Sequence, residues 1–192
     1  MKNKGLLLFL VVMISGVNFL SAEKEDVESL TGWFWTIKLH KNLNNEDLSN
    51  KTILKKKVLF SNFKLANLEK ATVKDSYFYW NNFYNANLSK MILDNTTFER
   101  CDFSRAMFVK FNKNNIDAID NIVFKKCNFN NVNMAKANFV SVKFIDCKFV
   151  GTNMTSANFR DAIFIDCKIK PASIKDTYFD NTIFENSPID IE

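Results

Sequence analysis

Glycine and histidine are scarce in this sequence of 192 residues, which contains four glycines and one histidine, His40. The shortage of glycine excludes a protein built around a glycine-rich phosphate-binding loop. A lone imidazole without a set of partner residues is far more often a surface residue than a catalytic one. The acidic residues are scattered one or two at a time, and no catalytic-triad order or metal-ligand spacing is present. The sequence therefore argues against an enzyme, and we expect neither a cofactor nor a metal ion.

A strong excess of charge of one sign is also missing. The formal net charge is +5, and two of the positive charges, Lys2 and Lys4, lie within the first few residues. An excess this small does not indicate nucleic-acid binding, which usually requires a clearly basic surface. We therefore expect no nucleic-acid partner.

Residues 1–22 have the order of a secretory signal peptide. Two lysines precede an apolar stretch from Gly5 to Ile14, and the small residues Ser21 and Ala22 precede a charged segment. The apolar stretch is shorter than the run of about 20 residues that a membrane-spanning helix needs, and an uncleaved anchor is the alternative. We predict cleavage after Ala22, a mature N-terminus at Glu23, and an exported protein that is periplasmic or extracellular.

Phenylalanine, by contrast, is abundant, with 20 residues, and much of it recurs at a spacing of five. From Cys127 to Ile189 the third residue of each group of five is large and apolar, the first is small or compact, and the others are mostly polar. A period of five matches neither an α-helix, with about 3.6 residues per turn, nor a β-strand, with a side-chain period of two. The period therefore predicts a fold that turns its inward direction at every fifth residue.

Four such groups close a square coil of twenty residues, and successive coils stack as parallel strands about 4.8 Å apart. At a spacing of twenty, like residues lie on like residues, as stacked equivalent positions should. The predicted inward columns are Phe124, Phe144, Phe164 and Phe184; Phe139, Phe159 and Phe179; Met134, Met154 and Ile174; and Phe129, Phe149, Ile169 and Ile189.

The groups ANLEK, ANLSK, ANFVS and ANFRD, which begin at residues 66, 86, 137 and 157, resemble the consensus A(D/N)LXX of the pentapeptide-repeat family. The resemblance covers roughly residues 46 to 190. It implies an all-β fold, a right-handed quadrilateral parallel β-helix, which we expect to have about seven coils over residues 46–192. The best-understood cytoplasmic members of this family mimic DNA with strongly acidic faces and bind gyrase. The mildly basic charge and the leader of this chain depart from that pattern.

The reading frame of the repeat slips once. The large residues have numbers ending in 3 and 8 up to Phe108, and in 4 and 9 after it. We predict a bulge with one inserted residue within 109–121, which aligns Phe103 with Phe124, Phe108 with Phe129, and Phe98 with Ile119. The first core column would then consist of Phe63, Phe83, Phe103, Phe124, Phe144, Phe164 and Phe184.

Residues 23–45 lie outside the clear repeat and are interpreted as a segment that caps the N-terminal coil, because a solenoid leaves its end open. The bulky sequence Trp33-Phe34-Trp35 suits this role. The alternative for these aromatic residues is a platform for a ligand.

All four cysteines occupy the small inward position of their group. Cys127, Cys147 and Cys167 are twenty residues apart and are expected to stack above Ala66, Ala86 and Ala106, with Cys101 in the neighbouring column below Ile122. We expect free, buried thiols, because small apolar cysteines are common in protein cores. A disulfide in an oxidising compartment is the alternative. Three thiols in a line cannot surround a metal ion tetrahedrally.

The predicted outer faces carry three candidate contact surfaces, of which the first two are basic and aliphatic. The first is a basic ladder of residues twenty apart, Lys70, Lys90 and Lys110, with Lys148, Lys168 and Lys170 expected on the same side. It is either a solvated edge that discourages strand addition or a site for an anionic surface such as lipid headgroups or polysaccharide. The second is an apolar strip of Val123, Ile145, Ile163, Ile165 and Ile183, provided that these residues point outward.

A third candidate surface consists of aromatic residues that the repeat places outward within one coil, over Leu59 and Phe60 of the coil below. These residues are Tyr77, Tyr79, Trp80 and Tyr84. Tyrosine and tryptophan suit interfaces, because each offers a large apolar body with a polar tip. A segment containing Trp33 and Trp35 could instead fold back and cover them.

We therefore expect a non-enzymatic, exported β-solenoid that binds another protein through its outer faces. The alternatives are a structural envelope-associated rod and a binder of carbohydrate or lipid surfaces, and an end-to-end homodimer is a further option. Clustering of the exposed aromatic residues in the folded chain would favour a binding role, whereas scattering would favour the structural rod.

Overall fold

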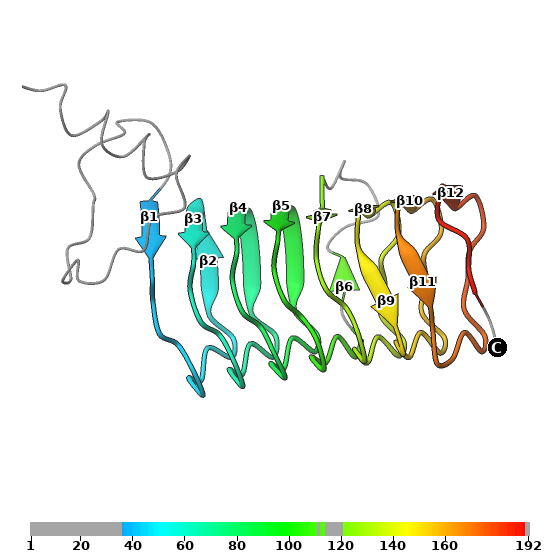
Figure 1. Cartoon of the computed structure of the whole chain (residues 1–192). Coiled ribbons are helices and arrows are strands. Elements are labelled where there is room, and N and C mark those ends of the chain that lie inside the picture. The colour runs from blue at the N-terminus through cyan, green and yellow to red at the C-terminus, as the bar shows by residue number, and fades with distance from the viewer. Residues whose placement is uncertain (1–35, 111, 114–120, 191–192) are drawn as a thin grey trace, which may run out of the picture.

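The computed structural model describes residues 36–110, 112–113 and 121–190. These residues form a parallel β-solenoid without a helix, whose coils follow one another along a single axis (Figure 1). The predicted signal peptide and residues 23–35 of the predicted cap lie outside the described residues. The strands are β1 Thr36–Leu39, β2 Thr52–Leu54, β3 Lys56–Leu59, β4 Thr72–Tyr79, β5 Ile92–Glu99, β6 Asn112–Lys113, β7 Val123–Lys125, β8 Lys143–Ile145, β9 Lys148–Val150, β10 Ile163–Ile165, β11 Lys168–Lys170 and β12 Ile183–Glu185.

One side of the solenoid is a continuous parallel sheet, which we call the long face. Its strand order is β1-β3-β4-β5-β7-β8-β10-β12. Most pairs along it join residues that are twenty apart, as in Phe144 with Phe164 and Phe164 with Phe184. The predicted fold class, a parallel β-solenoid with square coils of twenty residues, is confirmed.

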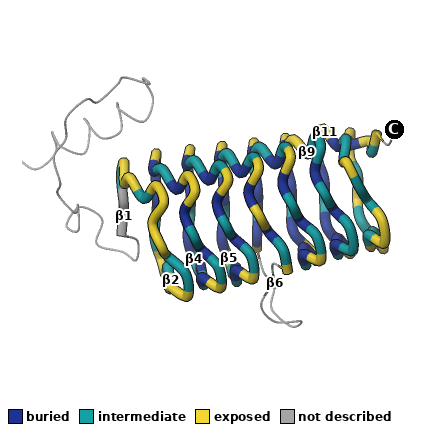
Figure 2. Tube along the Cα trace, turned by 90° about the horizontal axis from the view of Figure 1, so that it is seen from below, coloured by how far each residue is buried: buried dark blue, intermediate teal, exposed yellow. Residues whose placement is uncertain are grey.

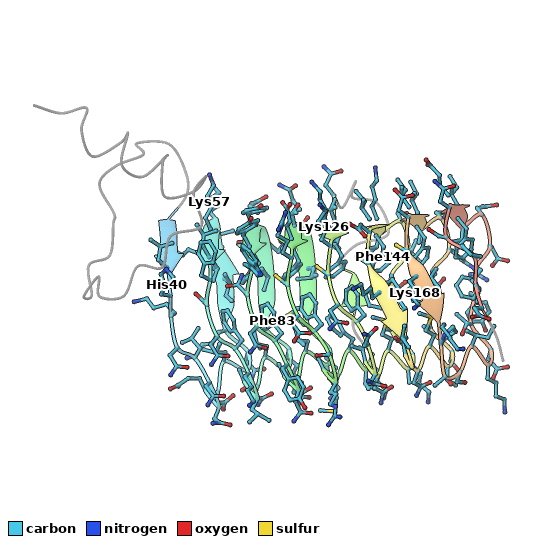
Figure 3. The ribbon with its side chains drawn as sticks, in the orientation of Figure 1. His40, Lys57, Phe83, Lys126, Phe144 and Lys168 are labelled. Carbon is cyan, nitrogen blue, oxygen red and sulfur yellow. The ribbon has the colours of Figure 1, made fainter. Side chains whose placement is uncertain are left out.

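The large residue of each side points into the coil. Where this residue is a phenylalanine, its ring usually stacks on a phenylalanine ring one coil away (Figure 3). Beneath the long face the ring centroids of Phe124 and Phe144 lie 5.4 Å apart, and those of Phe144 and Phe164 lie 4.8 Å apart. Rings of adjacent columns meet edge to face, as between Phe144 and Phe149 at 5.3 Å and 80°. Both arrangements are favourable for aromatic pairs. Stacked rings therefore fill the interior, with exposed residues concentrated at the turns (Figure 2).

Nearly every described corner is made by a residue with a left-handed backbone two positions after the large residue. Among the described residues, 26 residues other than glycine have positive φ, together with Gly151, whose φ is 68°. The asparagines that precede the large residues support these turns, as Asn67 illustrates. Its Oδ1 accepts the backbone N–H of Glu69 at 3.1 Å, and its Nδ2 donates to Asp47 one coil below at 3.1 Å. These asparagines therefore form hydrogen bonds both within a corner and between coils.

The predicted insertion of a single residue is wrong. Phe98 pairs with Phe124, and Asp102 pairs with Asn128, so this coil has a spacing of 26 residues, six more than the usual twenty. Phe103 therefore stacks on Phe129, at 5.2 Å between ring centroids, and not on Phe124. The extra residues lie between Lys113, which pairs in register with Leu93, and Val123.

The corrected register divides the predicted first core column between two columns, because Phe63, Phe83 and Phe103 continue into Phe129 and not into Phe124. The column beneath the long face is Val58, Phe78, Phe98, Phe124, Phe144, Phe164 and Phe184, and its neighbour is Phe63, Phe83, Phe103, Phe129 and Phe149, followed by Ile169 and Ile189. Phe159 stacks on Phe139 and on Phe179, at 5.3 and 5.6 Å, in a separate column. All these phenylalanines are buried except Phe179 and Phe184 near the C-terminal end, which are partly exposed.

The solenoid begins earlier than the repeat indicated. Strand β1 pairs with β3 in the usual register, with Lys38 opposite Val58, and Asn42 bridges to Asn62. Residues 36–45 are therefore part of a coil, and the predicted cap over 23–45 is wrong for this portion. The pattern was hidden because this coil lacks the aromatic residue of later coils.

Candidate functional site

The candidate site is an aromatic cluster on the N-terminal half of the long face, formed by Phe60, Tyr77, Tyr79 and Trp80. The alternation of strand β4 directs Phe78 into the core and its neighbours Tyr77 and Tyr79 outward. Trp80 follows at the corner, with φ of 55°, and Phe60 occupies the same corner one coil earlier, with φ of 52°. Consecutive residues of one strand and one corner therefore present their rings to the same side of the solenoid.

The four rings contact one another. Phe60 lies 5.6 Å from Tyr79 and 6.0 Å from Trp80, measured between ring centroids, while Tyr79 lies 5.8 Å from Trp80 and 6.2 Å from Tyr77. His40 stacks on Phe60 at 5.5 Å and lies at the N-terminal end of the solenoid (Figure 3). The side chains of Trp80 and Phe60 remain 55% and 37% exposed, so this packing leaves a broad apolar surface in contact with solvent.

Polar partners fix the cluster and give it a basic edge. The Tyr77 hydroxyl donates a hydrogen bond to Glu99 Oε2 at 2.8 Å, and Glu99 Oε1 pairs with Lys125 Nζ at 3.6 Å. Partial burial and the neighbouring Glu99 carboxylate raise the pKa of Tyr77, so this hydroxyl remains a donor at neutral pH. The guanidinium of Arg100 lies 5.4 Å from the Trp80 ring centroid, within the range of a cation–π contact.

Tyr84 does not join the cluster, although the sequence placed it in the same surface. It lies beyond the corner that Trp80 makes, on the next side of the coil. There its ring lies between the Lys64 ammonium at 5.6 Å and the Arg105 guanidinium at 5.9 Å. Neither the role of Arg100 nor the stacking of His40 was predicted from the sequence. The signal for both is the spacing of twenty along His40, Phe60, Trp80 and Arg100.

The predicted basic ladder occupies a different corner. Lys70, Lys90 and Lys110 are exposed at successive left-handed corners, and the longer coil brings Lys136 next to them in the same column. Lys90 Nζ forms an ion pair with Glu69 Oε1 at 2.8 Å. The expectation that Lys148, Lys168 and Lys170 continue this ladder is wrong, because they lie in β9 and β11 on another side of the coil.

The residues of the predicted apolar strip do point outward, on the C-terminal half of the long face. In β8, β10 and β12 the central phenylalanines face the core and the flanking residues face solvent. The strip consists of Val123, Ile145, Ile163, Ile165 and Ile183, and Ile183 is 55% exposed. The long face therefore carries aromatic rings at one end and branched aliphatic side chains at the other.

The four cysteines are free and buried, and all belong to one column. Because the longer coil has 26 residues, Cys101 lies below Cys127 and not in the neighbouring column, as the hydrogen bond from Asn128 N to Cys101 O at 3.0 Å shows. Each thiol lies within hydrogen-bonding distance of backbone carbonyls, as with Cys147 Sγ and Phe124 O at 3.3 Å. Burial raises the pKa of the Cys127 thiol, which keeps it protonated.

Among the described residues, no group of histidine, cysteine and acidic side chains is arranged to hold a metal ion. Within the same part of the chain, no helix has the length and apolar character required to span a bilayer. The site is thus a surface of aromatic rings and charged side chains.

Comparison with known proteins identifies the repeat. The model described as "Pentapeptide repeat region" matches residues 117–191, and the model described as "Pentapeptide repeats (8 copies)" matches residues 61–100 and 82–110. No curated protein matches the sequence.

Similar solved structures are also pentapeptide-repeat or related proteins of low identity. A trypsin-treated variant of QnrB1, a plasmid-mediated fluoroquinolone resistance protein, is 14% identical, with 80% of this chain and 81% of that chain covered and a TM-score of 0.49. A pentapeptide-repeat protein from the thylakoid lumen of Arabidopsis thaliana is 24% identical, with coverages of 60% and 69% and a TM-score of 0.28. HetL from the cyanobacterium Nostoc, involved in regulating heterocyst differentiation, is 12% identical, with coverages of 79% and 84% and a TM-score of 0.26. With its coils of four five-residue sides and family matches on both sides of the longer coil, the chain belongs to the pentapeptide-repeat family.

Proposed function

We propose that this solenoid is a non-enzymatic protein-binding module and that the aromatic cluster is its binding surface. The observation that carries the proposal is the exposure of Trp80 and Phe60, 55% and 37%, within a group of four touching rings. Single exposed apolar residues are ordinary, but contiguous groups of them usually mark an interaction site.

The composition of the cluster favours a protein partner. Tryptophan, tyrosine and arginine are the residues that most often dominate the binding energy of protein interfaces, and here Trp80, Tyr79 and Arg100 are adjacent. A purely structural rod would have no need to gather these residues on one side. The clustering is therefore better explained by binding than by the structural role.

The cluster is also ordered before any partner arrives. Tyr77 and Tyr79 project from a strand whose backbone is paired on both sides, and Tyr77 is held by Glu99 at 2.8 Å. Side chains that are already fixed lose little entropy on binding, which favours affinity. The proposal includes export, since residues 1–22 have the order of a signal peptide, so the partner would be a periplasmic or extracellular protein.

A carbohydrate or an anionic surface is the second candidate ligand class, and the exposed corner column of Lys70, Lys90, Lys110 and Lys136 favours it. This column and the aromatic cluster lie on different corners of the coil. Variants of each surface can therefore be tested separately.

The proposal is tested by capture of native-host envelope and secreted proteins on the immobilised protein. Trp80→Ala should lower capture of a specific protein by at least about tenfold, as expected for loss of an interface hot spot. The matched control is Tyr178→Ala, which removes a ring that is 49% exposed and also contacts an arginine, Arg160, at 4.9 Å. Equal capture by the wild type and both variants would contradict the proposal. Loss of capture only on removal of Lys90 and Lys110 would favour the basic ladder instead.

A further inference from the structure

The corner column that contains Phe60 and Trp80 changes its chemistry in steps along the solenoid. It begins with aromatic residues, continues with two basic residues and ends with two acidic residues and an amide. All of its members have positive φ, are exposed and follow one another by backbone hydrogen bonds between coils. They are His40, Phe60, Trp80, Arg100, Lys126, Asp146, Asp166 and Asn186.

The long face beside this column also differs between its two halves, of which one is aromatic and the other aliphatic. Its N-terminal half presents Tyr77 and Tyr79 from β4, and its C-terminal half presents Ile163, Ile165 and Ile183 from β10 and β12. Within the described residues, neither half is buried as a core is. Tyr77, Tyr79, Ile163 and Ile165 are half-buried, and Ile183 is exposed.

We propose that a second copy of this chain packs against the long face in the antiparallel direction, with strand β12 and Asn186 of each copy covering Tyr77, Tyr79 and Trp80 of the other. This inference deepens the proposed function and rests on it, because it names the partner of the aromatic cluster. Such an interface is isologous: one surface patch serves both copies through a twofold axis.

Charge complementarity selects the register. A twofold axis midway between the coils of Lys126 and Asp146 places Lys126 of one copy opposite Asp146 of the other. Because residues of this column are one coil apart, the same axis places Arg100 opposite Asp166 and Trp80 opposite Asn186. Each of these contacts occurs twice, so four ion pairs form along the rim.

Between the rims the same axis places β4 opposite β12 and β5 opposite β10, while the Glu99–Lys125 ion pair of each copy lies opposite Ile165 and Ile145 of the other. Tyr77 in β4 lies opposite Ile183 in β12, and Thr97 in β5 lies opposite Ile163 in β10. Tyr79 lies opposite Glu185, whose carboxylate can accept a hydrogen bond from the phenol. Sheets that pack face to face lie about 10 Å apart, a distance that side chains of this size fill.

Other occupants fit this face less well. Parallel packing about a twofold axis along the rod would place this corner column opposite the other rim of the long face, where Arg100 would meet Asn95 and Asp166 would meet Asp161, so the ion pairs along the rim would be lost. An anionic lipid surface would meet Asp146, Asp166 and Glu185 at the C-terminal half of the same face. The order of basic and acidic residues therefore favours an antiparallel copy.

The interface is small. Six strands of each long face take part, from β4 to β12, and their spacing gives a contact roughly 25 Å long. A contact of this length and one side of a coil in width is smaller than a standard specific interface, so we expect a weak, transient dimer with a dissociation constant in the micromolar range.

The test is a charge exchange monitored by sedimentation equilibrium of the purified full chain over a range of concentrations. Arg100→Glu and Asp166→Arg should each weaken dimerisation by at least about tenfold, because each leaves like charges opposed at two places. The chain that carries both substitutions should recover the wild-type dissociation constant within about threefold. Arg100 and Asp166 are three coils apart within one chain, so recovery cannot arise from a contact inside a single copy.

Asp176→Arg is the control. Asp176, like Asp166, is an exposed acidic residue at a left-handed corner, but its corner column does not border the long face. It should leave dimerisation unchanged. The dimer proposal is overturned if the wild type is monomeric at all concentrations up to about 100 micromolar, well above the range expected for such an interface. It is also overturned by a dimer that neither charge reversal weakens.

Failure of this inference can be distinguished from failure of the proposed function. A monomeric chain that captures a different protein through Trp80 would overturn the antiparallel dimer and support the aromatic cluster as a binding surface. A chain that neither dimerises nor shows Trp80-dependent capture would overturn both.

Discussion

At the scale of single residues, stability resides in the stacked rings, and the outer residues are left available for contacts. Phe144 is fully buried and stacks on rings above and below, at 5.4 and 4.8 Å. Trp80, in contrast, is 55% exposed at a corner. A ring enclosed on all sides leaves a cavity when it is truncated, whereas an exposed ring leaves none.

Phe144→Ala should therefore lower the free energy of unfolding by about 3–5 kcal/mol. Trp80→Ala, as the exposed control, should change the same quantity by less than about 1 kcal/mol. Urea denaturation of both variants measures the difference. A loss below about 1 kcal/mol for Phe144→Ala would show that this ring is not part of a close-packed core.

The cysteine column should be chemically inert in the folded state. Cys101, Cys127, Cys147 and Cys167 are buried and free, and burial raises the pKa of Cys127. Since the thiolate is the reactive form, a thiol reagent at pH 8 should modify none of the four without denaturant and all four with it, as read by mass spectrometry. Rapid modification of the native protein would contradict burial. A native mass two units low per pair would indicate a disulfide.

At the scale of the coil, the sequence shows which residues point inward but not how many residues a loop contains. The period of five identified Phe78 as buried and Tyr77, Tyr79 and Trp80 as outward. An insertion of one residue and an insertion of six residues shift the frame of the repeat by the same amount, because one and six leave the same remainder after division by five. Only the pairing of Phe98 with Phe124 distinguishes them.

Contacts across coils were likewise only partly predictable. Residues twenty apart, such as Phe60 and Trp80, lie together because they share a corner. Tyr84 follows Trp80 by only four residues, yet the intervening corner turns it onto another side. Proximity in this fold therefore follows the coil period rather than separation along the chain.

The longer coil should tolerate shortening. Deletion of residues 114–119 joins Lys113 to Asp120, leaves β6 in place and restores a coil of twenty. We expect the free energy of unfolding to change by less than about 2 kcal/mol, because surface insertions contribute little to stability. The control is deletion of residues 132–137, which shifts every later side out of register and should prevent folding. Loss of cooperative unfolding after the first deletion would contradict the inferred register.

At the scale of the whole molecule, the chain is a rod of stacked coils with one continuous sheet along its length. We predict from its N-terminal residues where that sheet acts. The order of charges, apolar residues and small residues in 1–22 predicts removal of this segment during export. Mass measurement of the protein from its native host should give a chain that begins at Glu23. An intact Met1 would contradict the predicted cleavage and the exported location.

The most direct test of the aromatic cluster as a binding surface is the fluorescence of Trp80. The chain has three tryptophans, so Trp33→Phe with Trp35→Phe leaves Trp80 as the only one. At concentrations below the micromolar range, where a weak dimer dissociates, acrylamide should quench Trp80 readily, as expected for a ring that is 55% exposed. Addition of the captured protein should shift the emission to shorter wavelengths and reduce quenching, because an interface excludes water from its central residues. Unchanged emission and quenching on that addition, or a Trp80 that is already protected in the free chain, would contradict a binding surface at this cluster.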